Sequence, residues 1–110
     1  MANFINENEI DMALDYLRDN AGAAAQARAN RAYLEEYRKV LKAQIMQESP
    51  EMPVNAQERN AYADARYTTH LEALKIAIYE DEKHRFLLTA AEAKIDAWRT
   101  QQATERAMKI

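Results

Sequence analysis

The sequence predicts an all-α protein, and three observations lead to that prediction. One glycine and two prolines in 110 residues are too few turn residues for a sheet protein. Alanine, glutamate, leucine, lysine, arginine and glutamine are abundant, and these residues lose little conformational freedom in a helix. Apolar residues recur at spacings of three and four, the period of one helix face. The length suits a single helical domain, residues 1–110, with a modest core.

The first long helix is expected over about residues 7–48. Asn6 followed by Glu9 matches a capping box, in which each side chain bonds to the other's backbone N–H. Seven of the twelve residues from 21 to 32 are alanine. They join an early apolar set to a late one: Ile10, Leu14 and Leu17, then Tyr33, Tyr37, Val40, Leu41 and Ile45. Bridging the sets needs repeated steps of four, which drift around a helix, so we expect a bend or short break at residues 20–22.

The segment after this arm is predicted to be a proline-rich loop at residues 49–55. Pro50 and Pro53 each remove a backbone donor and restrain the preceding residue. A short connecting helix over residues 56–63 follows, with Asn55 and Glu58 spaced as a second capping box.

The second long helix is expected over about residues 68–109, where Thr69 and Glu72 have capping-box spacing. Its apolar stripe runs through Tyr67, Leu71, Leu74, Ile78, Leu88, Ala91, Ile95 and Trp98. A rod of roughly 60 Å cannot bury its own stripe. We therefore expect an elongated antiparallel helical hairpin of the two arms. Because two arms leave part of each stripe uncovered, self-association into a dimer or higher homo-oligomer should complete it.

The middle of this stripe turns polar, with Asp81, His84 and Arg85 where the spacing calls for apolar residues. Asp81 and His84 lie at i, i+3, as in the Glu-x-x-His motif of di-metal helical bundles. His70 has no acid three residues before it, so the motif is a single imperfect copy and we expect no metal or other cofactor. The better interpretation is a charged seam that contacts another helix and serves as an interaction site.

Enzymatic activity is not expected from this composition. The chain has no cysteine, and its one serine, Ser49, is followed by proline. One glycine rules out a glycine-rich phosphate loop. His70 and His84 therefore have no serine nucleophile beside them.

Nucleic-acid binding is the alternative interpretation, although the formal net charge is −3. Two groups of basic residues fall on helix faces: Arg28, Arg31, Arg38 and Lys42 in the first arm, and Arg99, Arg106 and Lys109 near the C-terminus. Acidic residues lie among both groups, so solvated faces with local ion pairs are favoured over direct DNA or RNA binding.

The expected location is the cytoplasm. No basic region followed by an apolar run opens the chain, and no stretch approaches the roughly 20 apolar residues of a membrane span. The lack of cysteine also suits a reducing compartment.

Four segments of the chain carry a resemblance to a known group of proteins. They read YTTHLEAL at 67–74, EDEKHR at 80–85, AAEAKIDAWRTQQA at 90–103 and RAYLEEY at 31–37, and WRTQQA at 98–103 is the most specific. Together they resemble small uncharacterised helical proteins of tailed phages and prophages. The resemblance implies genes near early recombination and replication functions, hence a bacterial host cell, and it assigns no catalytic or binding residue.

Taken together, these features predict a non-enzymatic phage or prophage protein that acts by protein–protein interaction with an unidentified partner. It is expected to be an accessory of phage DNA recombination or replication, or a modulator of a host factor. The seam and whichever tyrosines stay exposed would provide specificity.

Overall fold

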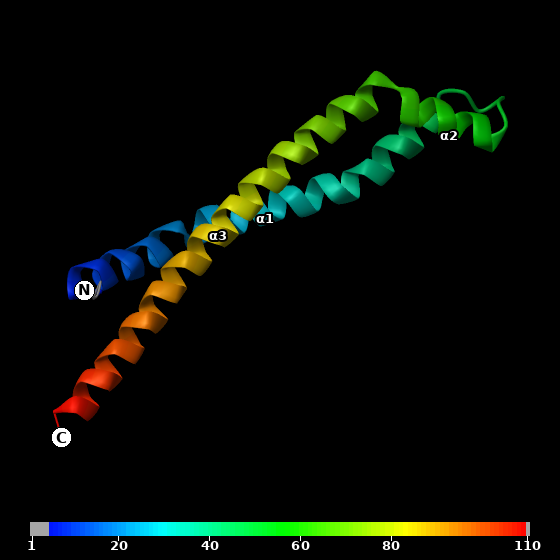
Figure 1. Cartoon of the computed structure of the whole chain (residues 1–110). Coiled ribbons are helices and arrows are strands. Elements are labelled where there is room, and N and C mark those ends of the chain that lie inside the picture. Colours follow the sequence, from blue (N-terminus) through cyan, green and yellow to red (C-terminus); the bar gives the residue numbers. More distant parts are fainter. Residues whose placement is uncertain (1–4, 110) are drawn as a thin grey trace. The chain divides into compact units, whose positions relative to one another are not determined.

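In a computed structural model, which describes residues 5–109, the chain forms three α-helices and no strand (Figure 1). Helix α1 spans Glu7–Met46, α2 spans Val54–Ala63 and α3 spans Ala65–Met108. The all-α prediction is therefore confirmed. Of the predicted boundaries, the first arm ends at 46 rather than 48, and the second begins at 65 rather than 68.

Helix α1 begins with the predicted cap. Asn6 Oδ1 accepts a hydrogen bond from the Glu9 backbone N–H at 2.8 Å. This bond satisfies one of the donors that the first helical turn leaves without a partner.

A break at residues 20–22 is excluded, because α1 is helical throughout its 40 residues. Its buried and half-buried positions in this region advance by alternating steps of three and four: Ile10, Ala13, Leu17, Asn20 and Ala24. Such alternation keeps a set of residues on one face without a break. The steps of four through Leu14 do not apply, since Leu14 is exposed.

The loop between α1 and α2 covers residues 47–53, and α2 starts earlier than its predicted capping box. Pro53 is the N-cap residue of α2, with an extended backbone (φ −59°, ψ 150°) and no side-chain cap. Its carbonyl accepts from the Gln57 N–H at 3.0 Å. Asn55 lies inside α2, where its Oδ1 accepts from the Ala56 N–H at 2.9 Å.

A single residue, Asp64, joins α2 to α3. Its extended backbone (φ −70°, ψ 140°) interrupts the helical path, and its N–H donates to the Ala61 carbonyl. Its Oδ1 accepts from the Arg66 N–H at 2.8 Å, so Asp64 caps α3. The capping box predicted at Thr69 is therefore wrong, because that residue lies inside α3.

The chain divides into two compact units. The central unit is Gln26–Glu82, and the terminal unit combines the segments before residue 26 and after residue 82. In the central unit, Leu41, Ile45 and Ala61 form the buried cluster. Half-buried side chains of Tyr37, Met46 and Tyr67 pack against it, so α2 and the adjoining parts of α1 and α3 share this core.

Within the central unit, the inner face of α3 passes through His70 rather than Leu71. His70 is 7% exposed and Leu71 is 44% exposed, so the predicted stripe is wrong at this position. The His70 Nε2 lies 2.8 Å from the Leu34 carbonyl oxygen, and its ring centroid is 5.8 Å from that of Tyr37. This hydrogen bond offsets the cost of burying a polar ring.

In the terminal unit, Ile10 and Ala13 are buried and Ile95 and Trp98 are half-buried. Ile5 is bound on both sides by Gln101, which accepts from the Ile5 N–H at 3.1 Å and donates to the Ile5 carbonyl at 2.9 Å. Across residues 5–109, no helix is both long and apolar enough to cross a membrane.

Candidate protein-interaction surface

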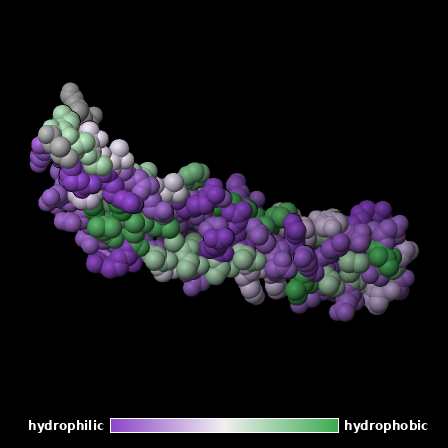
Figure 2. Space-filling model, turned by 90° about the horizontal axis from the view of Figure 1, so that it is seen from below, coloured by the Kyte–Doolittle hydropathy of each residue, from purple (hydrophilic) through white to green (hydrophobic). Residues whose placement is uncertain are grey.

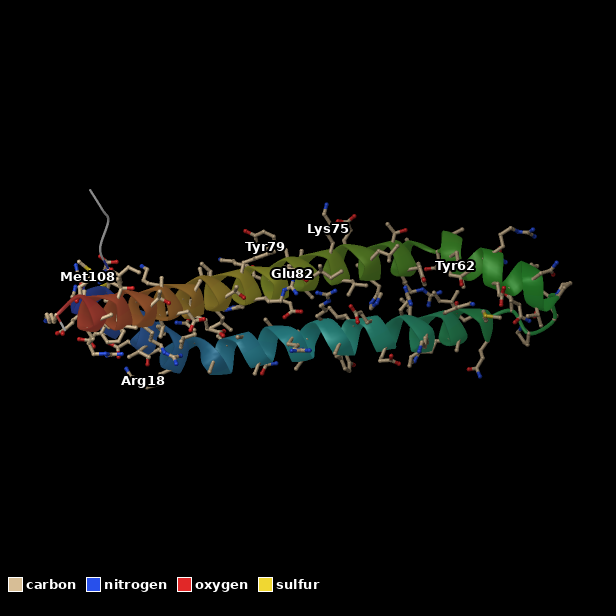
Figure 3. The ribbon with its side chains drawn as sticks, turned by 60° about the horizontal axis from the view of Figure 1, so that its bottom comes forward. Arg18, Tyr62, Lys75, Tyr79, Glu82 and Met108 are labelled. Carbon is tan, nitrogen blue, oxygen red and sulfur yellow. The ribbon has the colours of Figure 1, made fainter. Side chains whose placement is uncertain are left out.

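Three carboxylates surround the Arg31 side chain in the central unit. The Arg31 Nη1 lies 3.2 Å from Asp81 Oδ2 and 3.1 Å from Glu82 Oε1, and its Nε lies 2.9 Å from Glu35 Oε1. Figure 3 shows the Glu82 side chain turned toward α1. The carboxylates of Glu35, Glu82 and Asp81 raise the pKa of Arg31, in that order of importance. We call these four residues the Arg31 cluster.

The Arg31 cluster shows what Asp81, one of the three predicted seam residues, contacts. The Asp81 side chain is 19% exposed and meets the opposite charge of α1, within the same unit. Asp81 thus has a partner in its own chain, and Arg31 is engaged by three carboxylates. Because each acid pairs best at one relative position of the helices, the cluster favours one register.

The other two seam residues, His84 and Arg85, lie in the terminal unit, on the same continuous helix α3 as Asp81. His84 is half-buried, and among the described residues its buried Nδ1 has no hydrogen-bond partner. Arg85 is exposed, with its guanidinium carbon 5.4 Å from the centroid of the Phe86 ring. Placing Arg85 on the inner stripe was therefore wrong.

Large apolar side chains on the surface of α3 are the main feature that the sequence reasoning missed. Ile76, Tyr79 and Phe86 are each 64% exposed, although α3 buries its other face. Figure 3 shows Tyr79 and Lys75 pointing away from α1. On the face seen in Figure 2, apolar side chains lie among polar ones. The sequence did contain one signal of this exposure. Ile76 and Tyr79 are three residues apart, and this spacing places them together on the helix face opposite the buried one.

Two tyrosines of the central unit, on α1 and α2, are also exposed. Tyr33, expected in the apolar stripe of the first arm, is 65% exposed and stacks on Tyr37 with ring centroids 5.9 Å apart. Tyr62 of α2 is 52% exposed and meets Tyr67 edge to face at 5.2 Å. An aromatic ring on the surface offers both an apolar face and a hydroxyl to a partner.

The basic residues of the first arm differ in their surroundings. Arg28 and Arg38 are exposed. Lys42 Nζ lies 3.6 Å from Glu58 Oε1 and 4.9 Å from the Tyr62 ring centroid. Tyr62 first, and Glu58 to a smaller extent, raise the pKa of Lys42. With Arg31 in its cluster, two of the four basic residues are engaged by acids of the same chain.

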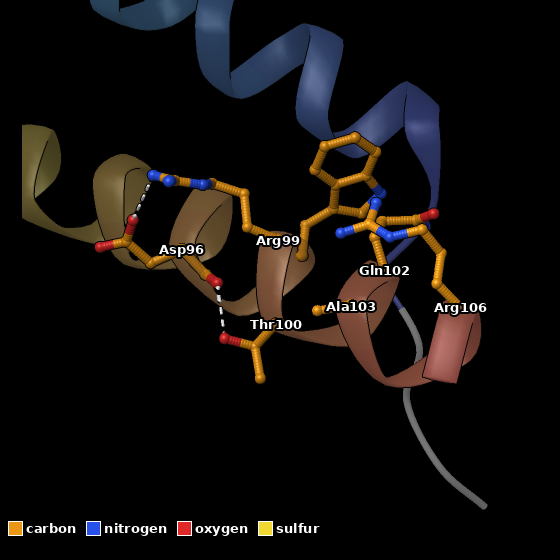
Figure 4. A pocket seen from close by; sticks show the side chains of 7 residues that line it. Asp96, Arg99, Thr100, Gln102, Ala103 and Arg106 are labelled. Carbon is orange, nitrogen blue, oxygen red and sulfur yellow. Dashed lines mark hydrogen bonds and ion pairs between the residues drawn. The ribbon is translucent and has the colours of Figure 1, made fainter. Parts of the chain in front are cut away.

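Two of the basic residues near the C-terminus, Arg99 and Arg106, line an open groove on α3 (Figure 4). Its lining comes from one helix: Asp96, Trp98, Arg99, Thr100, Gln102, Ala103 and Arg106. Arg99 Nη1 lies 3.6 Å from Asp96 Oδ1, and Thr100 Oγ1 donates to the Asp96 carbonyl at 3.2 Å. Lys109 follows the helix end and is exposed. The groove therefore carries a surplus of positive charge.

An ion-pair network at the end of α1 was not foreseen. Arg66 donates from Nη1 and Nη2 to the two Glu48 carboxylate oxygens, both at 2.7 Å, and from Nε to Asp64 Oδ1 at 2.9 Å. Arg66 lowers the pKa of Asp64 to about 2 and also lowers the pKa of Glu48. The only sequence signal was Asp64 two residues before Arg66, because Glu48 is distant in the chain.

Within residues 5–109, no three His, Asp or Glu side chains are grouped so that they could hold a metal ion. His70 is committed to a backbone carbonyl. What the surface does offer is exposed aromatic and aliphatic side chains beside charged rows.

Comparison with protein-family models, curated proteins and solved structures yields no match to this chain.

Proposed function

We propose that this chain is a non-enzymatic helical protein that acts by binding another protein and by self-association. The observation that carries the proposal is the exposure of Ile76, Tyr79 and Phe86, each 64%, on a helix that also packs inward. Removing such side chains from water would contribute about 25 cal/mol per Å² of apolar surface. Their presence on a water-facing surface is therefore best explained by a partner.

The proposed architecture is an antiparallel helical hairpin of α1 and α3, with α2 at its tip, completed by a second copy. Contacts within the central unit support the antiparallel arrangement, since Glu48 meets Arg66 and Arg31 meets Asp81. Among residues 5–109, no large side chain is fully buried. A core this thin is typical of chains that gain further burial by association.

The proposed setting is the cytoplasm of a bacterial host cell. There the protein would be an accessory of phage recombination or replication, or would modulate a host factor. This part of the proposal rests on the resemblance of residues 31–37, 67–74, 80–85 and 90–103 to small phage and prophage proteins.

Photo-crosslinking tests the binding proposal directly. A photoreactive phenylalanine analogue at Tyr79, or separately at Phe86, should give a discrete crosslinked protein in infected or lysogenic cells. The same analogue at Glu51, in the loop before α2, is the matched control, because Glu51 is exposed and lies outside all three helices. Equal, diffuse crosslinking at all three positions would contradict the proposal.

The second candidate function, nucleic-acid binding, is supported by the exposed Arg28 and Arg38 and by Arg106 in the groove of α3. It is weakened by the carboxylates that engage Arg31 and by the Glu58 contact of Lys42. If it holds, Arg28→Glu with Arg38→Glu should weaken binding to all DNA sequences alike, and the affinity should fall steeply with salt. No mobility shift at physiological salt would exclude it.

A further inference from the structure

Two rows of opposite charge lie on the surface of the terminal unit. The first turns of α1 present exposed carboxylates at spacings of four residues, from Glu7, Asp11 and Asp15. The last turns of α3 present Arg99 and Arg106 in the groove described above. We call these the acidic row and the basic row.

The two rows do not neutralise each other within the chain. Among the described residues, the only ion pairs of these rows are local: Arg18 with Asp15 at 3.3 Å, and Arg99 with Asp96 at 3.6 Å. The side chains in both pairs are more than half exposed, so these contacts contribute little. Within residues 5–109, Glu7, Asp11 and Arg106 are exposed and form no ion pair, so they can meet a charged partner.

The dimensions of the rows match. At 1.5 Å per residue, Arg99 and Arg106 are about 10 Å apart along α3, and Glu7 and Asp15 are about 12 Å apart along α1. Aligned antiparallel, Glu7 faces Arg106 and Asp15 faces Arg99, with Asp11 between them. This alignment also places the partially positive start of α1 beside the partially negative end of α3.

We propose that the basic row of one copy receives the acidic row of a second copy. The same contact occurs twice about a two-fold axis, because each copy contributes one row of each kind. This inference rests on the self-association proposed above and specifies the surface that performs it.

Charge reversal tests the pairing. The acid-reversed variant carries Glu7→Lys and Asp15→Lys, and the base-reversed variant carries Arg99→Glu and Arg106→Glu. Each alone places like charges opposite each other in both contacts, so its dimer dissociation constant should rise at least about tenfold in sedimentation equilibrium. Mixed in equal amounts, the two variants should form a heterodimer, because both contacts are again between opposite charges.

Matched controls carry the same change in net charge at exposed positions outside the rows. Glu51→Lys with Glu72→Lys controls for the acid-reversed variant, and Arg28→Glu with Arg38→Glu controls for the base-reversed one. Both controls should dimerise like the wild type. Far-UV circular dichroism of all variants separates loss of pairing from loss of helix.

The outcomes separate this inference from the wider proposal. A wild-type dimer that survives either reversal, or reversed variants that fail to pair with each other, overturns the pairing of the rows but leaves self-association standing. A wild type that stays monomeric at about 10 μM, a concentration at which a micromolar dimer forms, overturns both.

Discussion

The side chain of Gln101 forms two hydrogen bonds with the backbone of Ile5. Its side-chain amide accepts from the Ile5 N–H at 3.1 Å and donates to the Ile5 carbonyl at 2.9 Å, across 96 residues of sequence. Both backbone groups precede α1 and have no helical partner. A single side chain of α3 therefore fixes the backbone that leads into the first helix.

Replacing Gln101 should release this segment. Gln101→Glu removes the donor and places a negative charge against the Ile5 carbonyl, whereas Gln101→Ala removes both bonds. With about 1 kcal/mol for each hydrogen bond, we expect a loss of about 1–2 kcal/mol in the free energy of unfolding. Faster hydrogen exchange at the Ile5 amide should accompany it. Gln44→Glu on the exposed surface of α1 is the control, and an unchanged exchange rate in the Gln101 variants would refute the role.

The core of the central unit should be sensitive to truncation at its best-buried aliphatic side chains. Leu41→Ala should lower the free energy of unfolding by about 2–5 kcal/mol, and Ile45→Val by about 1 kcal/mol. Val40 is 47% exposed, so Val40→Ala provides a control that should change stability much less. Urea unfolding of the three variants measures the difference. Equal effects at Leu41 and Val40 would contradict the assigned core.

Gly22 should limit the stability of α1. It is helical and exposed, and nothing lies within 4 Å of the position that an added Cβ would take. Gly22→Ala should therefore raise the free energy of unfolding by about 1 kcal/mol, the difference in helix propensity. The midpoint of thermal unfolding should rise accordingly. A lower midpoint would show that residues 20–22 are not helical in solution.

The Arg66 network should make stability depend on acid pH. The pKa of Asp64 is about 2, below its ordinary value of 3.8, and the pKa of Glu48 is also lowered. Carboxylates with lowered pKa contribute stability above their unfolded values, and that stability is lost as the pH falls through the folded values. Thermal midpoints should therefore fall between pH about 5 and about 2.

The variant that tests this contribution is Arg66→Gln, which removes the positive charge that Glu48 and Asp64 share. Its midpoint should be lower at neutral pH and should depend less on acid pH than that of the wild type. Arg59→Gln, at an exposed position of α2, is the control. Identical pH profiles for Arg66→Gln and the wild type would rule out the network as a source of stability.

Arg31 and Asp81 should be energetically coupled. Arg31→Ala leaves Glu35, Asp81 and Glu82 without their common partner, so the single variant should be less stable than the wild type. Adding Asp81→Ala should recover part of that loss, because one of the repelling carboxylates is gone. A double-mutant cycle by urea unfolding measures the coupling. Strict additivity would mean that the cluster has no role in register.

Local signals in the sequence were enough for the helices but not for their faces. Scarce glycine and the two prolines placed the loop, and Asn6 marked the start of α1. Periodicity could not show that His70 rather than Leu71 is the buried residue. Hydropathy favours burial of leucine, and only the hydrogen bond to the Leu34 carbonyl makes burial of His70 tolerable. The same limit applies to Tyr33, which looks like a core residue until its exposure is known.

The interaction residues were predictable to a smaller extent. Asp81 could be expected to meet an opposite charge, but Arg31 could not be named as its partner before the two helices were aligned. Arg85 was misplaced because one residue along a helix turns a side chain by about 100°. The link between Arg66 and Glu48 depends on where the chain returns after the loop, which no local pattern encodes.

The one-residue joint at Asp64 limits how this protein can be altered by insertion. An extra residue at that point would shift the start of α3 relative to α2, so that side chains such as His70 and Leu74 would leave their buried positions in the central unit. The loop of seven residues between α1 and α2 does not fix the orientation of one helix relative to the other in this way. Tags or fluorescent labels should therefore be placed at residues 49–53. Length variation among natural relatives should be found there and not at the joint.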